Sequence, residues 1–366
     1  MKKHVTSVIK ADTNSKKKCI LALAAFCIAV LLIIASLIDG FLFPLAYFRA
    51  FASAPSIAKR GEGDLRIHFL DVGQGDCTVI ELPDGKFMMV DGGNDGEAVR
   101  RSVLGYCKTL GVKKFDYILL THPESDHAGG LDDVLRCFGA EVIFLPYTTK
   151  ADGAYSDFLA AANEEGAECK ISQTYEYVCS EQADEFYFLL FLSPLNPSLD
   201  SSYYNPANAE DASSEDVNDA SAIVYFEYAG RSLLLTGDAS SKVEDKLVED
   251  YETIGKELFS RTVETAFGTQ VLTAELDSVD FLKAGHHGSS GSTGEALTAL
   301  CRPKAAFVSC GAGNGYGHPS LTCAENILSA SPDAEIYRTD ELGNIMLTIH
   351  SDGSYEVTYA AQNTAE

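Results

Sequence analysis

The sequence has few basic residues for its size. Its 366 residues include 28 lysines and arginines against 53 aspartates and glutamates, and the formal net charge is −25. No basic run stands out, and arginines do not alternate with aromatic residues, although such patterns usually supply the affinity for nucleic-acid phosphates. An acidic exterior is soluble and repels polyanions. Any polyanionic ligand would therefore need bound metal ions or a local basic patch.

Paired cysteine motifs are also absent. The ten cysteines are scattered, without a CxxC, and their spacing does not suggest a disulfide framework, although one remains open for an exported domain. A zinc–thiolate site is still less favoured by this spacing. Several cysteines, such as Cys77 and Cys310, lie in apolar runs and are expected to be small core residues.

Charge is missing from one long stretch near the N-terminus. Residues Ile20–Ile38 are 19 uncharged residues, which at about 1.5 Å each span roughly 28 Å, close to the thickness of a bilayer core. Six lysines and one aspartate precede them, a cluster that favours a cytoplasmic N-terminus. We therefore expect a single-pass anchor in the cell membrane, with the following chain extracytoplasmic. The alternative is a signal peptide cleaved at a small-x-small site within Ala50–Ala54.

Composition divides the chain into four parts and one insertion. We expect a cytoplasmic basic tail (1–18), a transmembrane anchor (19–43), a stalk (44–62) and a globular domain (63–362), with an acidic loop insertion at 195–221. The loop assignment depends on its Ser, Asn, Asp, Ala and Pro content.

Strands and helices alternate within the globular domain. Apolar patterns predict strands at 65–71, 76–82, 87–91, 115–121, 142–146, 186–192, 223–228, 232–236, 281–284 and 305–310. They predict helices at 97–110, 129–137, 155–165, after Asp238 to about 251, and near 322–329. A closing hairpin is expected around residue 352, and residues 252–276 are ambiguous. The pattern predicts an α/β fold with two mixed sheets sandwiched between helices.

Histidine is scarce, and its positions are informative. Only eight histidines occur, and five of them fall in three short segments that follow apolar strands: His122 and His127, His286 and His287, and His318. Loops at strand ends are where sheet proteins gather functional groups, and Asp238 occupies the same kind of position. The others, His4, His68 and His350, are expected to be structural or solvent-facing.

The first of these segments, THPESDHAGG at 121–130, is dense in potential metal ligands. His122 and Glu124 are two residues apart, so in an extended loop both point to one side. Two histidines with carboxylates suit Zn²⁺ or Mn²⁺, and a carboxylate such as Asp238 can bridge two ions. The alternative is that His122 and His127 cap helices or bond to loop carbonyls.

Six segments in a fixed order carry a resemblance to a known family: FLDVGQGD (69–76), VDGGN (90–94), LLTHPESDHAGG (119–130), LLLTGD (233–238), LKAGHHGSS (282–290) and YGHPS (316–320). Together they resemble the metallo-β-lactamase superfamily, most of all the branch that contains the hydrolase domain of the ComEC competence proteins. The resemblance runs from about residue 63 to about residue 360. It implies a metallo-β-lactamase-like αββα sandwich.

Carried over by position, the resemblance implies a set of metal ligands: His122, Glu124, Asp126, His127, Asp238, His286 and His318. It implies catalytic roles for Asp126, Asp238 and His287. It places five residues behind the metals or at the substrate, namely Asp71, Asp76, Asp91, Ser289 and Ser290. Asp91 would hold the metal loop, and residues 287–290 would form a cradle for a phosphate.

Two ions are expected, and the second site departs from the family pattern. One ion would use Asp126, His127, Asp238 and His318; the other would use His122, Glu124, Asp238 and either His286 or His287. Glu124 stands where the family has a histidine, and no histidine lies between His127 and His286. The second site is therefore expected to be richer in carboxylate and weaker, which suits Mn²⁺ or a single-metal enzyme.

The resemblance implies hydrolysis of an ester bond by a metal-activated water. A phosphodiesterase or nuclease-like enzyme is expected first, with two divalent ions (zinc or manganese) as cofactors and single-stranded DNA or a nucleotide as substrate. The membrane would be its other partner, through the N-terminal helix. The alternatives are a cell-envelope phosphoesterase acting on teichoic-acid or phosphocholine groups, and a degenerate metal-binding surface module.

Overall fold

The computed structural model describes residues 21, 23–28, 30–31, 57–148, 153–182, 184–194 and 213–359. Within these ranges no helix is both long and apolar enough to cross a bilayer. The expected tail, most of the expected anchor, residues 44–56 of the stalk and residues 195–212 of the insertion lie outside the described residues.

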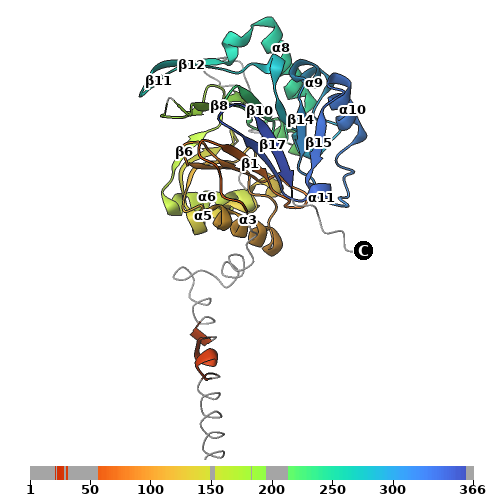
Figure 1. Cartoon of the computed structure of the whole chain (residues 1–366). Coiled ribbons are helices and arrows are strands. Elements are labelled where there is room, and N and C mark those ends of the chain that lie inside the picture. The colour runs from red at the N-terminus through yellow and green to blue at the C-terminus, as the bar shows by residue number, and fades with distance from the viewer. Residues whose placement is uncertain are drawn as a thin grey trace, which may run out of the picture.

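The first sheet has eight strands in the order β17-β16-β1-β2-β3-β4-β5-β6. Their bounds are β1 Leu65–Phe69, β2 Thr78–Glu81, β3 Phe87–Val90, β4 Phe115–Leu119, β5 Ala140–Leu145, β6 Glu168–Ile171, β16 Ile345–Ile349 and β17 Tyr355–Tyr359. Strands β3 to β6 run parallel to one another, and the other neighbours pair antiparallel. Helices α3 (Glu97–Leu110), α5 (Leu131–Phe138) and α6 (Gly153–Glu165) lie below this sheet in Figure 1.

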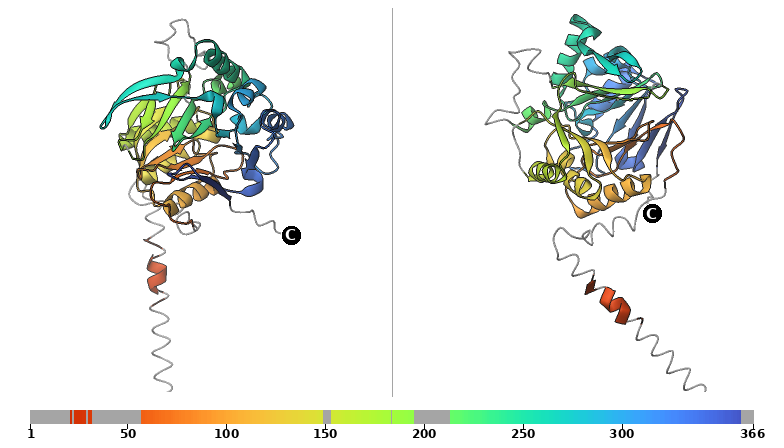
Figure 2. Two further views of the ribbon diagram at one scale, coloured as in Figure 1. Left: turned by 45° about the horizontal axis from the view of Figure 1, so that its top comes forward. Right: turned by 90° about the vertical axis from the view of Figure 1, so that its left-hand side faces the viewer.

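The second sheet has seven strands in the order β15-β14-β13-β10-β9-β8-β7. Their bounds are β7 Tyr177–Cys179, β8 Tyr187–Ser193, β9 Ile223–Tyr228, β10 Arg231–Leu235, β13 Phe281–Lys283, β14 Ala305–Val308 and β15 Glu335–Arg338. Helices α8 (Ser241–Thr253), α9 (Glu295–Cys301) and α10 (Leu321–Ala330) lie on the face of the second sheet that is turned away from the first sheet (Figures 1 and 2). The predicted arrangement of two mixed sheets between helices is confirmed.

The main core lies between the two sheets. The strands present buried apolar side chains to this space, among them Ile67, Leu189 and Phe226. Aromatic pairs join the sheets: the Phe69 and Phe307 rings stack with centroids 4.4 Å apart. Burial of this kind is worth about 1.5–3 kcal/mol for each large apolar side chain, so the inner faces fix how the sheets sit together.

Two segments differ from the sequence prediction. The helix expected at 129–137 is α5, and a separate short helix that was not expected, α4 (Ser125–Ala128), precedes it and carries His127. A Cβ at Gly129 would lie 2.2 Å from the Asp95 backbone nitrogen, and one at Gly130 would lie 2.3 Å from the Gly92 carbonyl oxygen. Only glycine therefore permits this close packing, which separates the two helices.

The ambiguous residues 252–276 form the short helix η2 (Lys256–Phe259) and the hairpin β11 (Ser260–Thr265) and β12 (Gly268–Thr273). This hairpin projects at the upper left of Figure 1. The remaining short elements are α7 (Ser214–Asn218), η3 (Leu276–Ser278), η4 (Gly285–Gly288) and α11 (Thr339–Leu342).

Parallel pairing brings the chemistry-bearing loops to one edge of the sandwich. Strands β3 and β4 are parallel neighbours in the first sheet, and β10, β13 and β14 are parallel neighbours in the second. The carboxyl ends of parallel strands meet at one edge of a sheet. The loops that leave these ends carry Asp91, His122, Asp238, His286 and His318.

Candidate metal centre

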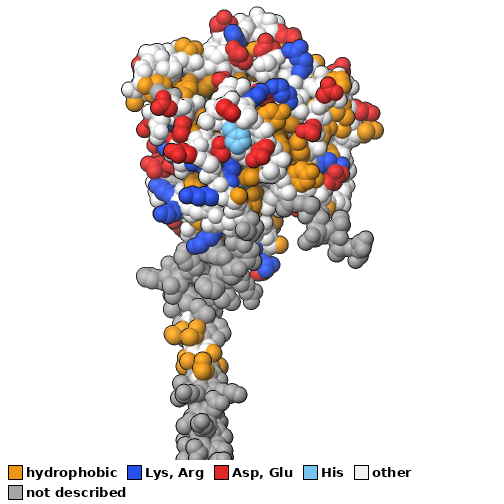
Figure 3. Space-filling view, in the orientation of Figure 1, with side chains coloured by type: hydrophobic (Ala, Val, Ile, Leu, Met, Phe, Trp, Pro, Cys, Tyr) orange, Lys and Arg blue, Asp and Glu red, His pale blue; other side chains and the backbone are white. Residues whose placement is uncertain are grey.

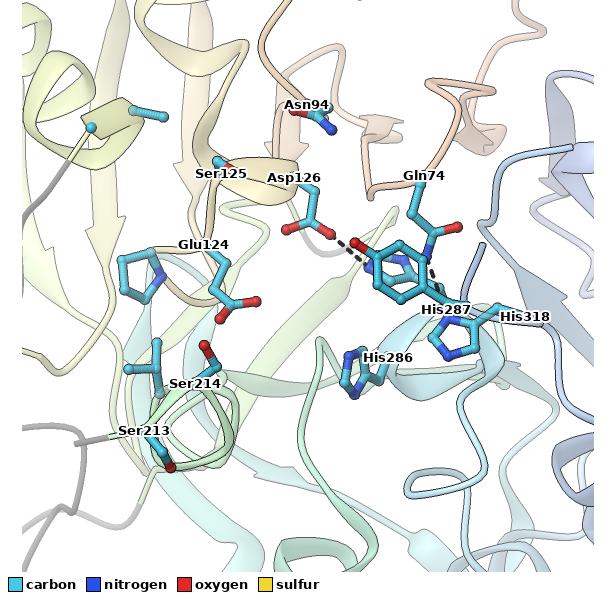
Figure 4. A pocket seen from close by; sticks show the side chains of 15 residues that line it. Gln74, Asn94, Glu124, Ser125, Asp126, Ser213, Ser214, His286, His287 and His318 are labelled. Carbon is cyan, nitrogen blue, oxygen red and sulfur yellow. Dashed lines mark hydrogen bonds and ion pairs between the residues drawn. The ribbon is translucent and has the colours of Figure 1, made fainter. Parts of the chain in front are cut away.

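Four buried side chains form the most compact ligand group. One ligand atom from each of Asp76, His127, Asp238 and His287 lies within 4.8 Å of every other. His127 Nε2 is 3.3 Å from Asp238 Oδ1, and His287 Nε2 is 3.4 Å from Asp238 Oδ2. Asp126 joins the group through its Oδ2, which is 3.2 Å from His287 Nε2 (Figure 4).

These residues fit a divalent ion. Five buried atoms of the described chain make no hydrogen bond here: Asp76 Oδ1, His122 Nε2, His127 Nε2, Asp238 Oδ1 and His287 Nε2. A buried polar atom without a hydrogen bond costs roughly 1–3 kcal/mol. The three imidazole nitrogens lie 3.3–4.0 Å from the Asp238 carboxylate, so a shared ion is a partner that these atoms fit. Imidazole nitrogens and carboxylate oxygens are a donor set for zinc or manganese.

Asp91 holds His127 from behind. Its Oδ2 is 2.8 Å from His127 Nδ1, and it also accepts hydrogen bonds from the Thr121 hydroxyl and backbone N–H, each 2.8 Å long. A carboxylate at Nδ1 keeps the proton on that nitrogen and leaves Nε2 free as a ligand. His287 is held in the same way: its Nδ1–H donates to the Ser309 carbonyl at 3.1 Å, and its Nε2 is left as a ligand.

Asp76 enters the group from the loop after β1, beside a buried lysine. Lys283 Nζ is 2.8 Å from Asp76 Oδ2, and both side chains are almost fully buried. Asp76 Oδ1 lies 3.6 Å from Nδ1 of His287, the ring nitrogen that turns away from Asp238. Asp76 therefore neutralises Lys283 and stands behind His287. Of the acidic residues expected behind the metals, Asp76 and Asp91 are brought there.

A second, looser group also surrounds the Asp238 carboxylate. Asp238 Oδ2 is 4.0 Å from His122 Nε2 and 3.7 Å from His286 Nε2. Glu124 Oε2 is 3.9 Å from His122 Nε2, and the Glu124 side chain is 30% exposed. Glu124 can thus turn toward solvent or toward an ion, and this second group is less closely assembled than the first.

The η4 turn that carries His286 and His287 is strained. Both residues have left-handed backbones, with φ of 48° and 56°, a region that L-residues other than glycine seldom adopt. The turn is held by hydrogen bonds from His286 N to the Gly237 carbonyl and from Ser289 N to the His286 carbonyl. Such residues cost about 1–3 kcal/mol each and cluster at functional sites.

Electrostatics couple the buried group. Burial alone would lower the pKa of His287, but Asp238 and Asp76 raise it to about 10. The pKa of His127 is likewise held well above its usual value, because Asp238 and Asp91 outweigh burial. Burial would raise the pKa of Asp238, yet His127 and His287 hold it well below its usual range. Without metal the histidines therefore keep protons that a bound ion must displace.

The group opens into a cleft of about 780 Å³. Figure 4 shows Glu124 and Ser214 facing each other on one side, with Gln74 and His318 together on the other. His318 was expected as a ligand of the first ion, and the side chain that lies beside Asp126 and Asp238 is that of His287. His318 lies at the cleft instead, with Nδ1 3.4 Å from Gln74 Nε2. Burial, together with His286 and His287, lowers the pKa of His318.

Three of the expected supporting residues lie elsewhere. Asp71 accepts a hydrogen bond from the Gly73 N–H within its own loop. Ser289 accepts one from Gly291 N, Ser290 is exposed, and neither serine lines the cleft. Of residues 287–290, where a phosphate cradle was expected, His287 lines the cleft. Two of the remaining histidines, His68 and His350, bond to carboxylates away from the centre, while His4 lies outside the described residues.

Lys283, Ser309 and Thr121 were missed from the sequence. The sequence offered one indication for Lys283, because a charged residue at the end of an apolar strand is unusual. Ser309 acts through its backbone carbonyl, which side-chain identity does not reveal.

Comparisons with known proteins agree with this geometry. A family model described as the metallo-beta-lactamase superfamily matches residues 70–150. ComE operon protein 3 of Bacillus subtilis (strain 168) is 26% identical over 306 residues, which cover 80% of this chain and 33% of that protein. Residues 70–150 are therefore similar to the metallo-β-lactamase superfamily. Recombination protein 2 of Haemophilus influenzae is 25% identical over 265 residues, which cover 72% of this chain and 26% of that protein.

The chain thus spans a third of the length, or less, of these two curated relatives. Among solved structures, CmlA, a diiron beta-hydroxylase from Streptomyces venezuelae, aligns with a TM-score of 0.46 and 13% identity over 82% of this chain and 55% of that one. The relationship to the metallo-β-lactamase superfamily and to competence proteins, expected from the six motifs, is confirmed. The fold is a metallo-hydrolase fold, and it implies a divalent metal.

Proposed function

We propose that the chain is a metal-dependent phosphodiesterase of nuclease-like type. The observation that carries this proposal is the set of five buried ligand atoms that make no hydrogen bond, gathered beside the cleft that Asp126 and His287 line. The similarity to Competence protein ComA of Neisseria gonorrhoeae, which is 22% identical over 292 residues, also supports it. The chemistry proposed is hydrolysis of one phosphodiester bond.

The residues that would hold the first ion are Asp126, His127, Asp238 and His287, and a second ion would use His122, Glu124, His286 and the shared Asp238. Bound divalent ions of the zinc or manganese kind would activate a water and stabilise the charge that develops on the phosphoryl oxygens. Because the second group has one more carboxylate than the family pattern, we propose that it binds its ion more weakly and prefers manganese.

The protein's own side chains prepare the site for this chemistry. Asp91 keeps a proton on Nδ1 of His127, and the Ser309 carbonyl keeps one on Nδ1 of His287. His318 is neutral near pH 7, since its pKa is lowered. If Gln74 donates to Nδ1 of His318, the proton of that ring is on Nε2. This N–H can then donate to a substrate or leaving-group oxygen in the cleft.

Hydrolysis by the purified full chain tests the proposal. After loading with Mn²⁺ or Zn²⁺, the chain should hydrolyse bis(p-nitrophenyl) phosphate or single-stranded DNA. Asp238→Asn should lose this activity, because Asp238 faces both ligand groups. A matched control is Asp280→Asn. Asp280 is a buried aspartate just before β13, and it accepts a hydrogen bond from Ser232 N. It lies at the amino ends of β10 and β13, whereas the metal centre lies at their carboxyl ends. A folded, metal-loaded chain that cleaves neither substrate would refute the proposal.

A cell-envelope phosphoesterase is the second candidate, and the charge distribution favours it. Acidic side chains are spread over the face drawn in Figure 3, where basic side chains form only small groups. Release of choline phosphate or glycerol phosphate from purified envelope, without cleavage of nucleic acid, would support it. A degenerate metal-binding module is the remaining alternative. About two metal ions per chain, together with loss of turnover in Asp238→Asn, would exclude it.

We also propose that residues 19–43 anchor the chain in the cell membrane, with the metal centre outside. The support is the uncharged run preceded by lysines. Protease added to intact cells should remove the domain and leave a short membrane-bound fragment. Protection of the domain from protease would contradict this orientation.

A further inference from the structure

An exposed aromatic side chain stands at the mouth of the cleft. Tyr316 is 75% exposed, yet it lines the same cleft as Asp126 and His287. Its ring stacks on His318, with centroids 5.7 Å apart and planes 28° apart. Water thus reaches most of the ring, while His318 supports part of it.

The loop that carries Tyr316 is held in shape by one side chain. Asn314 Oδ1 accepts hydrogen bonds from the backbone N–H groups of Tyr316 and His318, at 3.2 and 3.0 Å. Asn314 Nδ2 donates to the Gly311 and His318 carbonyls, at 2.9 and 2.6 Å. Because this loop is tied together, the exposed ring is a preorganised surface, which lowers the entropy cost of binding to it.

The cleft has no lysine or arginine for a highly charged ligand. Neither residue type is among the residues that line it within the described chain, and its polar side chains are amides, hydroxyls and imidazoles beside two carboxylates. Beyond the metal centre, phosphates would find no cationic partner. Affinity for a ligand must then come mainly from uncharged contacts, of which stacking on an aromatic ring is one of the strongest.

We infer that Tyr316 stacks on a nucleobase carried by the phosphodiester substrate. This inference rests on the proposed phosphodiesterase function and narrows it to substrates with a planar ring close to the scissile bond. It assigns Tyr316 to substrate positioning. A base stacks on an aromatic ring regardless of its sequence, so we expect little preference among the four bases.

The test uses the metal-loaded full chain with two probes of equal length. One is tetrathymidylate, and the other is a tetrameric abasic deoxyribose phosphate. Tyr316→Ala should raise KM for tetrathymidylate about tenfold, with kcat nearly unchanged, while Tyr316→Phe retains the wild-type value. The abasic probe should respond equally to all three proteins. Leu321→Ala is the matched control, because Leu321 is 74% exposed and lies nearby but does not line the cleft.

Binding separates this inference from the proposed function. Fluorescence anisotropy with labelled tetrathymidylate and the labelled abasic probe measures affinity whether or not either is cleaved. If neither probe nor bis(p-nitrophenyl) phosphate is hydrolysed, the proposed function fails, and the anisotropy still decides the role of Tyr316. An equal loss of affinity for both probes in Tyr316→Ala, or no loss for either, would overturn the inference.

Discussion

Replacing Asp91 with asparagine should weaken metal binding without disturbing the fold. Asparagine has nearly the same shape as aspartate, and it tolerates the left-handed backbone at this position, where φ is 58°. It has only one acceptor oxygen, however, whereas Asp91 accepts three hydrogen bonds from Thr121 and His127. If the amide oxygen retains the bond from Thr121 N, the amide nitrogen faces His127.

The consequence is a change in which ring nitrogen of His127 carries the proton. A donor facing Nδ1 requires that nitrogen to accept, so the proton moves to Nε2, the nitrogen that is 3.3 Å from Asp238. A protonated Nε2 cannot bind an ion. Losing a partner of this kind lowers metal affinity about 10- to 100-fold, or roughly 1.4–2.8 kcal/mol.

The assay is calorimetric titration of Zn²⁺ and Mn²⁺ into the metal-free full chain. Asp91→Asn is compared with Asp280→Asn, which removes the charge of a buried aspartate at the opposite ends of the strands. We expect the second variant to lose stability but to retain its metal affinity. If Asp91→Asn binds both metals as tightly as the wild type, Asp91 does not set the state of His127 and this reasoning is wrong.

Three further predictions concern the same centre. His287→Ala should lower metal affinity about tenfold or more, whereas His318→Ala should change it little; the reverse order in a chelator competition would restore His318 as the ligand. The raised pKa of His287, about 10 against 6.5 in the unfolded chain, means that its charged form stabilises the metal-free fold. That contribution is complete below about pH 6.5 and is lost as the pH rises toward 10, so thermal unfolding of the metal-free chain should occur at lower temperature across this window while metal affinity rises. A metal-free chain whose melting temperature climbs from pH 6.5 to 10 would contradict the coupling. Lys283→Met leaves Asp76 buried without its partner and should cost about 3–5 kcal/mol in urea unfolding; the double variant with Asp76→Asn should recover part of this, and equal losses in both would show that the pair is not coupled.

The fold followed from the sequence because its signals are local. Alternation in residues 223–236 and the Pro-Asp-Gly turn at 83–85 predict hairpins, and β9 pairs with β10 and β2 with β3 as expected. The break between α4 and α5 was missed because it depends on a contact with residues 92–95 that are distant in sequence. The hairpin of β11 and β12 was also missed, since its strands are largely exposed and show no strong apolar pattern.

The ligand segments were predictable from the sequence, but which of their side chains would lie beside Asp238 was not. Five histidines at strand ends pointed to one edge of the sandwich, and the structure brings four of them to within 4.0 Å of the Asp238 carboxylate. Choosing between His287 and His318 depends on which loop turns inward. That direction is set by the left-handed backbone of η4 and by the bond from His287 to Ser309. Neither of these features can be predicted from the identity of a single residue.

The most direct test of the central claim is anomalous diffraction at the metal absorption edge, from crystals of the full chain loaded with Mn²⁺ or Zn²⁺. The strongest peak should lie among Asp126, His127, Asp238 and His287, with a weaker one near His122, Glu124 and His286. A strongest peak at His318, or no peak beside Asp238, would contradict the account.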